Sequence, residues 1–242
     1  MNGFRITATS TLRPPNGRGD RIQAVYEQLR MQIVCGSLEP GTRIVETDVA
    51  GALGVSRTPV RAALQRLETE GYVFATGHAQ SRMCVAPLTR VDAAELFAIV
   101  GEIEALATRR AASEPFELRH LVVLRLRDIN DRLRVAAIAE PDLARAFELD
   151  RAFHDAIAAA GAGPRLASLH AIIKPQIERY ARAYVAALAA DIARSTTEHE
   201  AVIDAIEAGR PDEAGAAMRQ SWRNATERLA RVIESMGERG TW

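Results

Sequence analysis

Apolar residues recur at helical spacing in the first part of the chain, and glycines mark the ends of the predicted helices. Five of them lie on one helical face and predict a helix from about Asp20 to Gly36: Ile22, Val25, Tyr26, Leu29 and Ile33. Shorter helical patterns follow over residues 46–53 and 56–71. Residues 72–76 and 82–85 predict two strands, joined by a turn at 77–81. The first part of the chain is therefore expected to hold three helices and a β-hairpin.

After Pro87 the pattern changes, and only helical periodicity is present from about residue 90 to residue 237. Breaks at 114–115, 140–141, 161–164, near 191 and at 209–211 divide this part into six helices. The expected fold is mainly α. It consists of a flexible tail (1–18), a winged helix-turn-helix domain (19–88) and an all-α antiparallel helical bundle (89–242).

Composition and charge exclude several classes of protein. The longest apolar run, Ala183 to Ala190, is far shorter than the ~20 residues of a membrane helix, and residues 1–12 contain no apolar signal core. Cys35 and Cys84 form no CxxC pair, so we expect no disulfide framework and a cytoplasmic location. The net charge is zero, but residues 1–88 hold 10 arginines against 7 acidic residues. Phosphates would therefore be bound by the N-terminal part.

The helix that Ser56 opens carries the residue types that contact duplex DNA. Arg57 and Arg61 lie four residues apart and so share one face, where a guanidinium can donate two hydrogen bonds to guanine or hold a phosphate. Ser56 and Thr58 add hydroxyl groups beside a helix N-terminus, which also favours phosphate, and Gln65 extends the face. The alternative is a surface helix with solvated arginines, but the complete order of helices and hairpin favours a recognition helix.

Two segments then make the chain recognisable. They read PGTRIVE from Pro40 and LGVSRTPVRAALQRLETEG from Leu53, and they closely resemble the GntR family of bacterial transcription regulators. The resemblance covers about residues 20–88. It implies DNA contacts from Thr47, Ser56, Arg57, Thr58, Arg61 and the wing tip at Gly77 and His78. The chain has Arg82 where the family's wing usually has a glycine before its second strand.

Three ionisable side chains continue the apolar faces of two C-terminal helices. Asp150 and His154 extend the stripe that starts at Leu143, and His199 begins the stripe that continues through Val202. Burying an unpaired carboxylate costs several kcal/mol, so these groups are expected to have partners. Two imidazoles and a carboxylate suit a divalent transition metal. Alternatively, Asp150 and His154 pair with each other or face water, and the remaining histidines, 120 and 170, are read as structural.

The C-terminal helices also resemble the FCD-type effector-binding domain of the FadR subgroup, in the six-helix variant of vanillate-type regulators. This resemblance implies one divalent metal, with Zn²⁺ or Ni²⁺ expected, on Asp150, His154 and His199. Members usually supply a fourth histidine from the last helix, where this chain has Ser221. Water or the carboxylate of an effector would fill that position, which makes Ser221 a candidate effector-binding residue. An arginine common in the first helix of this domain is replaced by Val100.

The resulting hypothesis is a ligand-responsive, DNA-binding transcriptional repressor. A homodimer would bind a palindromic duplex operator, since two winged domains contact half-sites about one helical turn apart, and a small carboxylate effector in the bundle would alter their spacing. One alternative is a constitutive DNA-binding regulator whose bundle is purely structural. A metal-dependent enzyme is a third, but the sequence shows no GxGxxG or GxxxxGK[ST] loop and no nucleophile–base pair. We therefore expect no catalytic residues and no membrane partner.

Overall fold

The computed structural model describes residues 18–76, 83–139 and 142–240, and it forms two compact units. One unit comprises the described residues up to Leu88 together with those from Glu238 onward, and the other comprises Thr89–Gly237. Residues 1–17 of the predicted N-terminal tail and the wing tip lie outside the described residues, and Arg18, which was assigned to the tail, is the first residue of a helix. Among the described residues, no helix combines the length and the apolar character that are needed to cross a lipid bilayer.

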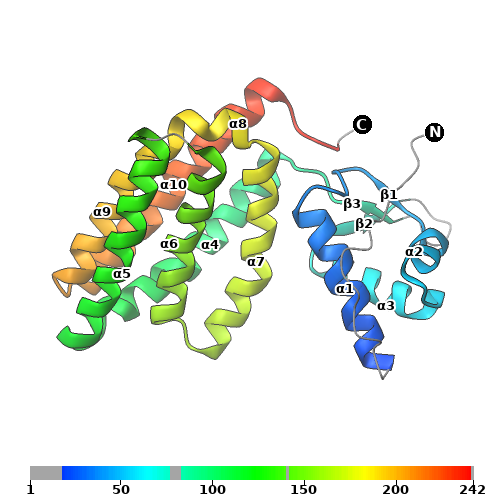
Figure 1. The fold of residues 1–242 in the computed structure, drawn as a ribbon, viewed down its shortest axis with the longest axis horizontal. Helices are drawn as coiled ribbons and strands as arrows, with labels where there is room; N and C mark the ends of the chain where they lie inside the picture. Colours follow the sequence, from blue (N-terminus) through cyan, green and yellow to red (C-terminus); the bar gives the residue numbers. More distant parts are fainter. Residues whose placement is uncertain (1–17, 77–82, 140–141, 241–242) are drawn as a thin grey trace. The chain divides into compact units, whose positions relative to one another are not determined.

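The first unit has the helix and strand order that the sequence predicts, with one additional strand (Figure 1). Its elements are α1 (Arg18–Val34), β1 (Arg43–Ile44), α2 (Glu46–Leu53), α3 (Arg57–Thr69), β2 (Val73–Ala75) and β3 (Met83–Val85). The strands form an antiparallel sheet in the order β1-β3-β2, with Arg43 opposite Cys84 and Val73 opposite Val85. The sequence did not reveal β1, because a two-residue strand is too short to show alternation.

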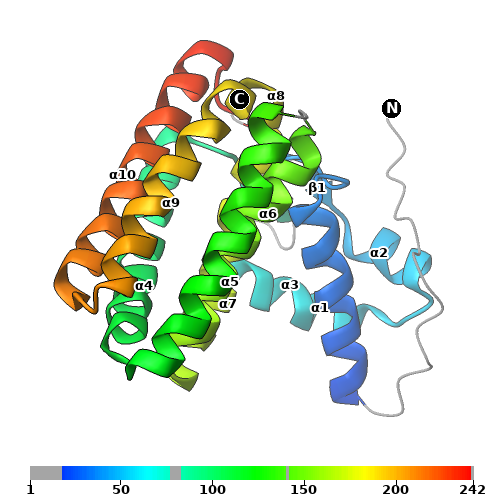
Figure 2. The same cartoon turned by 60° about the vertical axis from the view of Figure 1, so that its left-hand side comes forward.

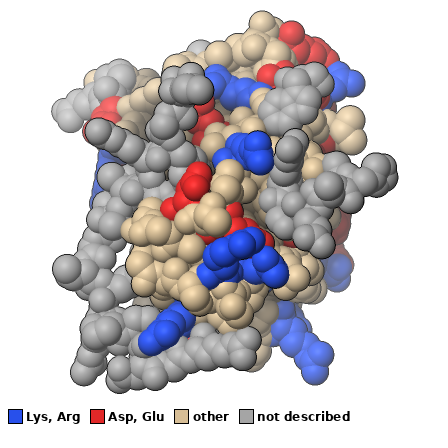
Figure 3. Space-filling model, turned by 90° about the vertical axis from the view of Figure 1, so that its right-hand side faces the viewer, with Lys and Arg blue, Asp and Glu red and all other residues tan. Residues whose placement is uncertain are grey.

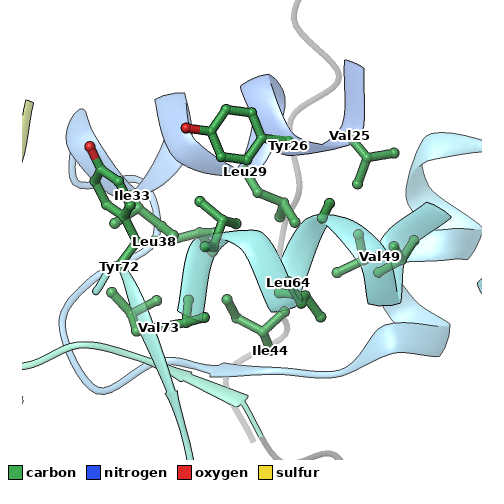
Figure 4. Packing of buried hydrophobic residues seen from close by; sticks show 14 of the residues in the cluster. Val25, Tyr26, Leu29, Ile33, Leu38, Ile44, Val49, Leu64, Tyr72 and Val73 are labelled. Carbon is green, nitrogen blue, oxygen red and sulfur yellow. The ribbon is translucent and has the colours of Figure 1, made fainter. Parts of the chain in front are cut away.

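The core of this unit lies where α1 packs across α3, above the sheet (Figure 4). Tyr26 and Leu29 of α1 point toward α3, whose Leu64 is 1% exposed. Gly54 ends α2 in the left-handed region at φ 65°, which glycine adopts without steric cost. Its N–H donates to the carbonyls of Ala50 and Gly51, so the helix closes and the chain turns toward α3.

The second unit is an all-helical bundle, which confirms the predicted fold class. Its elements are α4 (Arg90–Ser113), α5 (Phe116–Arg134), a π-helical turn (Val135–Ala139), α6 (Leu143–Gly161), α7 (Pro164–Ala183), α8 (Val185–Leu188), a 3₁₀ turn (Ala189–Asp191), α9 (Ile192–Glu207) and α10 (Pro211–Met236). Helix α4 is the central element, because it contacts α5, α6, α7, α9 and α10. Figure 2 shows α4 alongside α9 and α10. The long helices lie where the sequence places them, and the short α8 was not predicted.

A close crossing fixes the position of α6 on α4. A Cβ atom added to Gly161 would lie 1.8 Å from the carbonyl oxygen of Ala107, so only glycine fits at this crossing. The same pair of helices carries Glu104 and His154, whose side chains meet in the interior. The crossing therefore contributes to the geometry of the candidate site.

The chain beyond α10 returns to the first unit. Leu88 and Arg239 form an isolated antiparallel bridge: the Leu88 N–H donates to the Arg239 carbonyl at 2.8 Å, and the Arg239 N–H donates to the Leu88 carbonyl at 3.2 Å. Gly240 packs so closely on Pro40 and Gly41 that an added Cβ atom would lie 2.6 Å from the Pro40 carbonyl carbon. The sequence reading assigned all of 89–242 to the bundle, because a bridge between distant segments leaves no local pattern.

Candidate DNA interface and metal centre

The N-terminal half of α3 presents polar side chains to solvent. Ser56, Arg57, Thr58, Arg61 and Gln65 are all exposed, and the side chains of the two arginines are 58% and 56% exposed. The opposite face of α3 is buried, so the helix is held while its polar face is free to meet a ligand. A surface hollow of about 390 Å³ lies on this face, lined by Arg57, Thr58, Arg61, Ala62 and Gln65.

The other predicted DNA contacts have different outcomes. Ser56 occupies the N-cap position of α3, but its hydroxyl makes no capping hydrogen bond, so it stays available to a phosphate. Thr47 is exposed on α2 and donates a hydrogen bond of 3.2 Å to Asp48. Gly77 and His78 lie outside the described residues, so their role stays a prediction.

Arg57 and Arg61 of α3 share one acidic partner that the sequence reading did not single out. Arg57 and Arg61 each donate to the carboxylate of Glu46, which is only 6% exposed. Basic side chains gather in separate groups on the face of the molecule shown in Figure 3, and acidic side chains lie directly beside the largest group. Because Glu46 accepts hydrogen bonds from both side chains, Arg57 and Arg61 are held in place before any DNA is bound.

In the bundle, α6 and α9 bring the three predicted metal ligands together. One ligand atom each from Asp150, His154 and His199 lies within 4.8 Å of the other two. The Nε2 atom of His199 is 3.7 Å from Oδ1 of Asp150. Ligand atoms around a small divalent ion, each about 2.0–2.2 Å from it, are separated by roughly 3.3–4.4 Å, and this spacing falls within that range.

The hydrogen bonds around His199 fix which nitrogen faces Asp150. The Nδ2 group of Asn130 donates to the Thr196 carbonyl and to Glu200, each at 3.0 Å, so Oδ1 of Asn130 is an acceptor. His199 Nδ1 lies 3.1 Å from that oxygen and therefore donates its proton to it. Burial, together with the nearby His154, holds the pKa of His199 well below its ordinary value, so the ring is neutral.

A neutral ring that donates through Nδ1 leaves a lone pair on Nε2. This nitrogen is buried and has no hydrogen-bond partner, although Asp150 lies 3.7 Å away. A lone pair that faces a carboxylate oxygen is repulsive unless a cation lies between them. The donor set and the unpartnered nitrogen thus fit a divalent metal, and the three side chains would be its protein ligands.

Glu104 orients the second histidine. Its Oε2 atom lies 2.6 Å from Nδ1 of His154 and also accepts a 2.8 Å hydrogen bond from the indole nitrogen of Trp222. This contact directs the Nδ1 proton of His154 toward the carboxylate, which leaves Nε2 for a metal. A carboxylate behind a ligating histidine is the usual outer support of a metal site.

The same carboxylate joins α4, α6, α7 and α10. Oε1 of Glu104 lies 2.9 Å from Nε2 of His170 and 3.3 Å from Nζ of Lys174, and Glu104 itself is 0% exposed. Burial alone would raise its pKa, but His154, Lys174 and His170 together hold the pKa of Glu104 well below its ordinary value. The bundle therefore contains a buried, ionised carboxylate with four donors.

The hydroxyl of Ser221 already has a protein partner, because it donates to the carboxylate of Glu198 at 3.2 Å. Arg228 holds the same carboxylate through two bonds of 2.6 and 3.0 Å, and Asn224 adds a third donor at 2.9 Å. Val100, at the position of the family's arginine, is fully buried in α4. The role of Ser221 toward an effector stays a prediction.

Sequence reasoning missed part of this site. It read His170 as structural, whereas the ring of His170 lies against the Glu104 carboxylate. The missed residues are Glu104, Asn130, His170, Lys174 and Trp222. Glu104 carried the same signal as Asp150, since it follows Val100 on the apolar stripe of its helix. Lys174 is the only lysine among 31 basic residues, and a lysine where the chain otherwise uses arginine was also a signal that could have marked this position.

Comparisons with known proteins agree with this architecture. Residues 21–79 match the family described as bacterial regulatory proteins, gntR family, and residues 95–224, more than half of the chain, match the FCD domain. An HTH-type transcriptional regulator in an unstable DNA locus of Streptomyces ambofaciens is 30% identical over 227 residues, which cover 90% of this chain and 88% of that protein.

A second regulator is encoded in the TAR-I ttuE-ttuC' intergenic region of Agrobacterium vitis. It is 30% identical over 142 residues, 59% of this chain and 81% of its own length. Among solved structures, E. coli McbR/YncC has a TM-score of 0.64 at 21% identity, covering 87% of this chain and 97% of its own. A GntR regulator from Rhodococcus sp. RHA1 has a TM-score of 0.62 at 23% identity, covering 86% and 97%. These two likenesses show the shared fold.

The matched families and the relatives are transcriptional regulators and not enzymes. The chain belongs to the GntR family of bacterial transcriptional regulators and combines its DNA-binding helix-turn-helix domain with an FCD domain, the FadR-type architecture.

Proposed function

We propose that this regulator is a ligand-responsive repressor whose FCD domain holds a divalent metal on Asp150, His154 and His199. The observation that carries the proposal is the buried Nε2 atom of His199, which has no hydrogen-bond partner and lies 3.7 Å from the Asp150 carboxylate. A relative in Paenarthrobacter nicotinovorans, 28% identical over 189 residues, is assigned as the repressor of a D-xylose utilization operon, and that assignment supports the repressor reading.

Charge at the site supports an anionic effector. The acidic side chains of Glu104 and Glu198 are each paired with a cation, Lys174 and Arg228 respectively. Asp150 is the one carboxylate among the three proposed ligands, so a divalent ion beside two neutral imidazoles would leave one positive charge. When bound, such an ion supplies open coordination positions with a net attraction for a small carboxylate.

The DNA-binding unit supplies the output. Arg57 and Arg61 would contact base edges or phosphates of a palindromic duplex operator, with Ser56, Thr58 and Thr47 at the backbone. Two copies in a homodimer, working in the cytoplasm beside the chromosome, would bind half-sites about one helical turn apart. A carboxylate bound in the FCD domain would favour one placement of the two winged units, with a coupling of about 1–3 kcal/mol.

Calorimetry tests the metal site. Protein that has been freed of metal with a chelator is titrated with Zn²⁺ and, separately, with Ni²⁺. The expected result is one ion per chain for the wild type and a loss of most of the affinity in His199→Ala. His120→Ala is the matched control, because His120 packs on Phe116 of α5 and is not part of the group formed by Asp150, His154 and His199. Equal binding by the wild type and His199→Ala would reject the site and leave a constitutive regulator with a structural bundle.

Gel-shift assays test the DNA interface. The probe is the duplex that the wild-type protein enriches from a random library. The variant Arg57→Ala, Arg61→Ala is expected to remain folded by circular dichroism and to lose specific binding, since each arginine contact to a guanine contributes about 1–3 kcal/mol of discrimination. Unchanged binding of the enriched duplex would reject α3 as the recognition helix.

A further inference from the structure

Glu46 is a buried carboxylate whose partners are Arg57 and Arg61 of α3. It is the first residue of α2, and its side chain is only 7% exposed. Three hydrogen bonds of 3.0 Å reach it: Arg61 donates from Nε to Oε1 and from Nη2 to Oε2, and Arg57 donates from Nη2 to Oε2. The carboxylate is thus fixed within the protein, while both guanidinium groups lie at the surface.

These bonds use one edge of the Arg61 guanidinium and only the Nη2 group of Arg57. A guanidinium carries its N–H groups on two forked edges, one formed by Nε and Nη2 and the other by Nη1 and Nη2. Glu46 occupies the Nε–Nη2 edge of Arg61 and leaves the Nη1–Nη2 edge unused by this pair. That second edge is the one that can donate two parallel hydrogen bonds to O6 and N7 of guanine.

We propose that Glu46 is a positioning residue for DNA recognition, which presets the guanidinium groups of Arg57 and Arg61 and thereby makes the protein discriminate between base sequences. The proposal rests on the proposed role of α3 as the recognition helix. Holding a flexible arginine in its bound conformation removes part of the entropy cost that binding would otherwise impose. A fixed fork also tolerates fewer hydrogen-bonding partners than a mobile cation does.

Glu46 has a second effect through its charge. Hydrogen bonds from Arg61, together with those from Arg57, hold the pKa of Glu46 below its ordinary value against the effect of burial, so the carboxylate is ionised at neutral pH. One negative charge next to two arginines weakens their attraction for any phosphate. Binding to unrelated DNA is driven by that attraction, whereas binding to the correct sequence also uses base contacts. The carboxylate therefore lowers non-specific binding more than specific binding.

Glu46 also lies in the first turn of a helix, where any acidic residue is favoured by the helix dipole. Asp48 shares that first turn and is exposed, so a carboxylate for the dipole is already present. A purely structural role for Glu46 would change the thermal stability of the protein. It would leave the ratio of specific to non-specific DNA binding unchanged.

The test compares Glu46→Gln with Glu68→Gln. Both substitutions remove one negative charge from the DNA-binding unit, and Glu68 is an exposed residue in the last turn of α3. Two probes are used, the duplex that the wild type enriches from a random library and a scrambled duplex of the same length and composition. Affinities are measured by fluorescence anisotropy over a series of salt concentrations.

For Glu46→Gln we expect tighter binding of the scrambled duplex, a steeper dependence on salt, and a ratio of specific to non-specific affinity at least about fivefold lower, which is the lower end for one two-bond base contact. Glu68→Gln is expected to keep the wild-type ratio. An unchanged ratio in Glu46→Gln, or an equal fall in both variants, would overturn the proposal. If Glu46→Gln does not fold, Glu46→Asp keeps the charge but shortens the reach and therefore tests the positioning effect alone: its ratio of specific to non-specific affinity should fall without a gain in non-specific binding, whereas Glu68→Asp should keep the wild-type ratio.

The variant Arg57→Ala, Arg61→Ala separates failure of this proposal from failure of the proposed recognition helix. If Glu46 acts through the arginines, adding Glu46→Gln to that variant changes the affinity ratio no further. If the arginine variant keeps the wild-type ratio, or if the wild type enriches no duplex, the recognition helix itself is rejected. If the arginine variant loses discrimination and Glu46→Gln keeps it, only the positioning role of Glu46 is rejected.

Discussion

Replacing Glu104 with glutamine is expected to destabilise the bundle and weaken metal binding together. The carboxylate is 0% exposed and has four donors, and one of them is the ammonium group of Lys174, itself 7% exposed. Removing one partner of a buried ion pair typically costs about 3–5 kcal/mol, because it leaves a buried charge without a counter-charge. We expect a loss of this size for metal-free Glu104→Gln in urea unfolding.

A matched control and a compensating change sharpen this prediction. Glu102 lies on the same helix with a side chain 70% exposed, so Glu102→Gln is expected to change the free energy of unfolding by less than about 0.5 kcal/mol. Adding Lys174→Met to Glu104→Gln removes the orphaned ammonium group and should restore part of the loss. The pair of substitutions therefore separates the charge effect from simple loss of packing.

Metal affinity provides the second readout. Because Glu104 accepts the Nδ1 proton of His154, its loss frees the ring to turn and should weaken Zn²⁺ binding by about 10–100-fold in calorimetry. Glu102→Gln should bind Zn²⁺ as the wild type does. Unfolding free energies of Glu104→Gln and Glu102→Gln that agree within error would refute the reasoning about the buried carboxylate. Equal Zn²⁺ affinities would refute its orienting role.

Three further predictions concern pH, helix packing and metal removal. Folding lowers the pKa of His199, so the unfolded chain binds more protons than the folded protein below about pH 6.5, and the free energy of unfolding should fall with decreasing pH by up to ~1.4 kcal/mol per pH unit. Urea titrations of His199→Asn should show a shallower fall. Identical slopes of unfolding free energy against pH in the two proteins would contradict the lowered pKa of His199. Gly161→Ala should lower the midpoint of thermal unfolding because its Cβ would overlap the Ala107 carbonyl, whereas Gly51→Ala, with nothing within 4 Å, should be neutral or stabilising. When free Zn²⁺ is at 100 times its Kd, bound metal stabilises the wild type by about 2.7 kcal/mol, so a chelator should lower its unfolding temperature by the equivalent of that amount and should not affect Asp150→Asn. An equal shift in both proteins would place the metal elsewhere.

Local signals predicted most of the fold. Helix α3 and the breaks between the long helices were readable because periodicity and helix-ending glycine or proline act within a few residues. Strand β1 and the bridge between Leu88 and Arg239 were not, since each depends on a partner far away in the sequence. Pairing of this kind has no signature in either segment alone.

The candidate site divides in the same way. Asp150, His154 and His199 were found because polar groups on an apolar stripe stand out in sequence. Their supporting residues were not, because the role of Glu104 or Asn130 arises only when four or five helices meet. Arg57 and Arg61 of α3 were predicted as DNA contacts, but their shared carboxylate lies 11 and 15 residues earlier in another helix.

The most direct test of the proposed metal site is anomalous diffraction at the zinc edge from crystals grown with Zn²⁺. We predict one strong peak per chain, bonded to Nε2 of His199, Nε2 of His154 and a carboxylate oxygen of Asp150. A map with no peak at these three side chains, recorded from crystals in which Zn²⁺ is bound at other positions, would contradict the account.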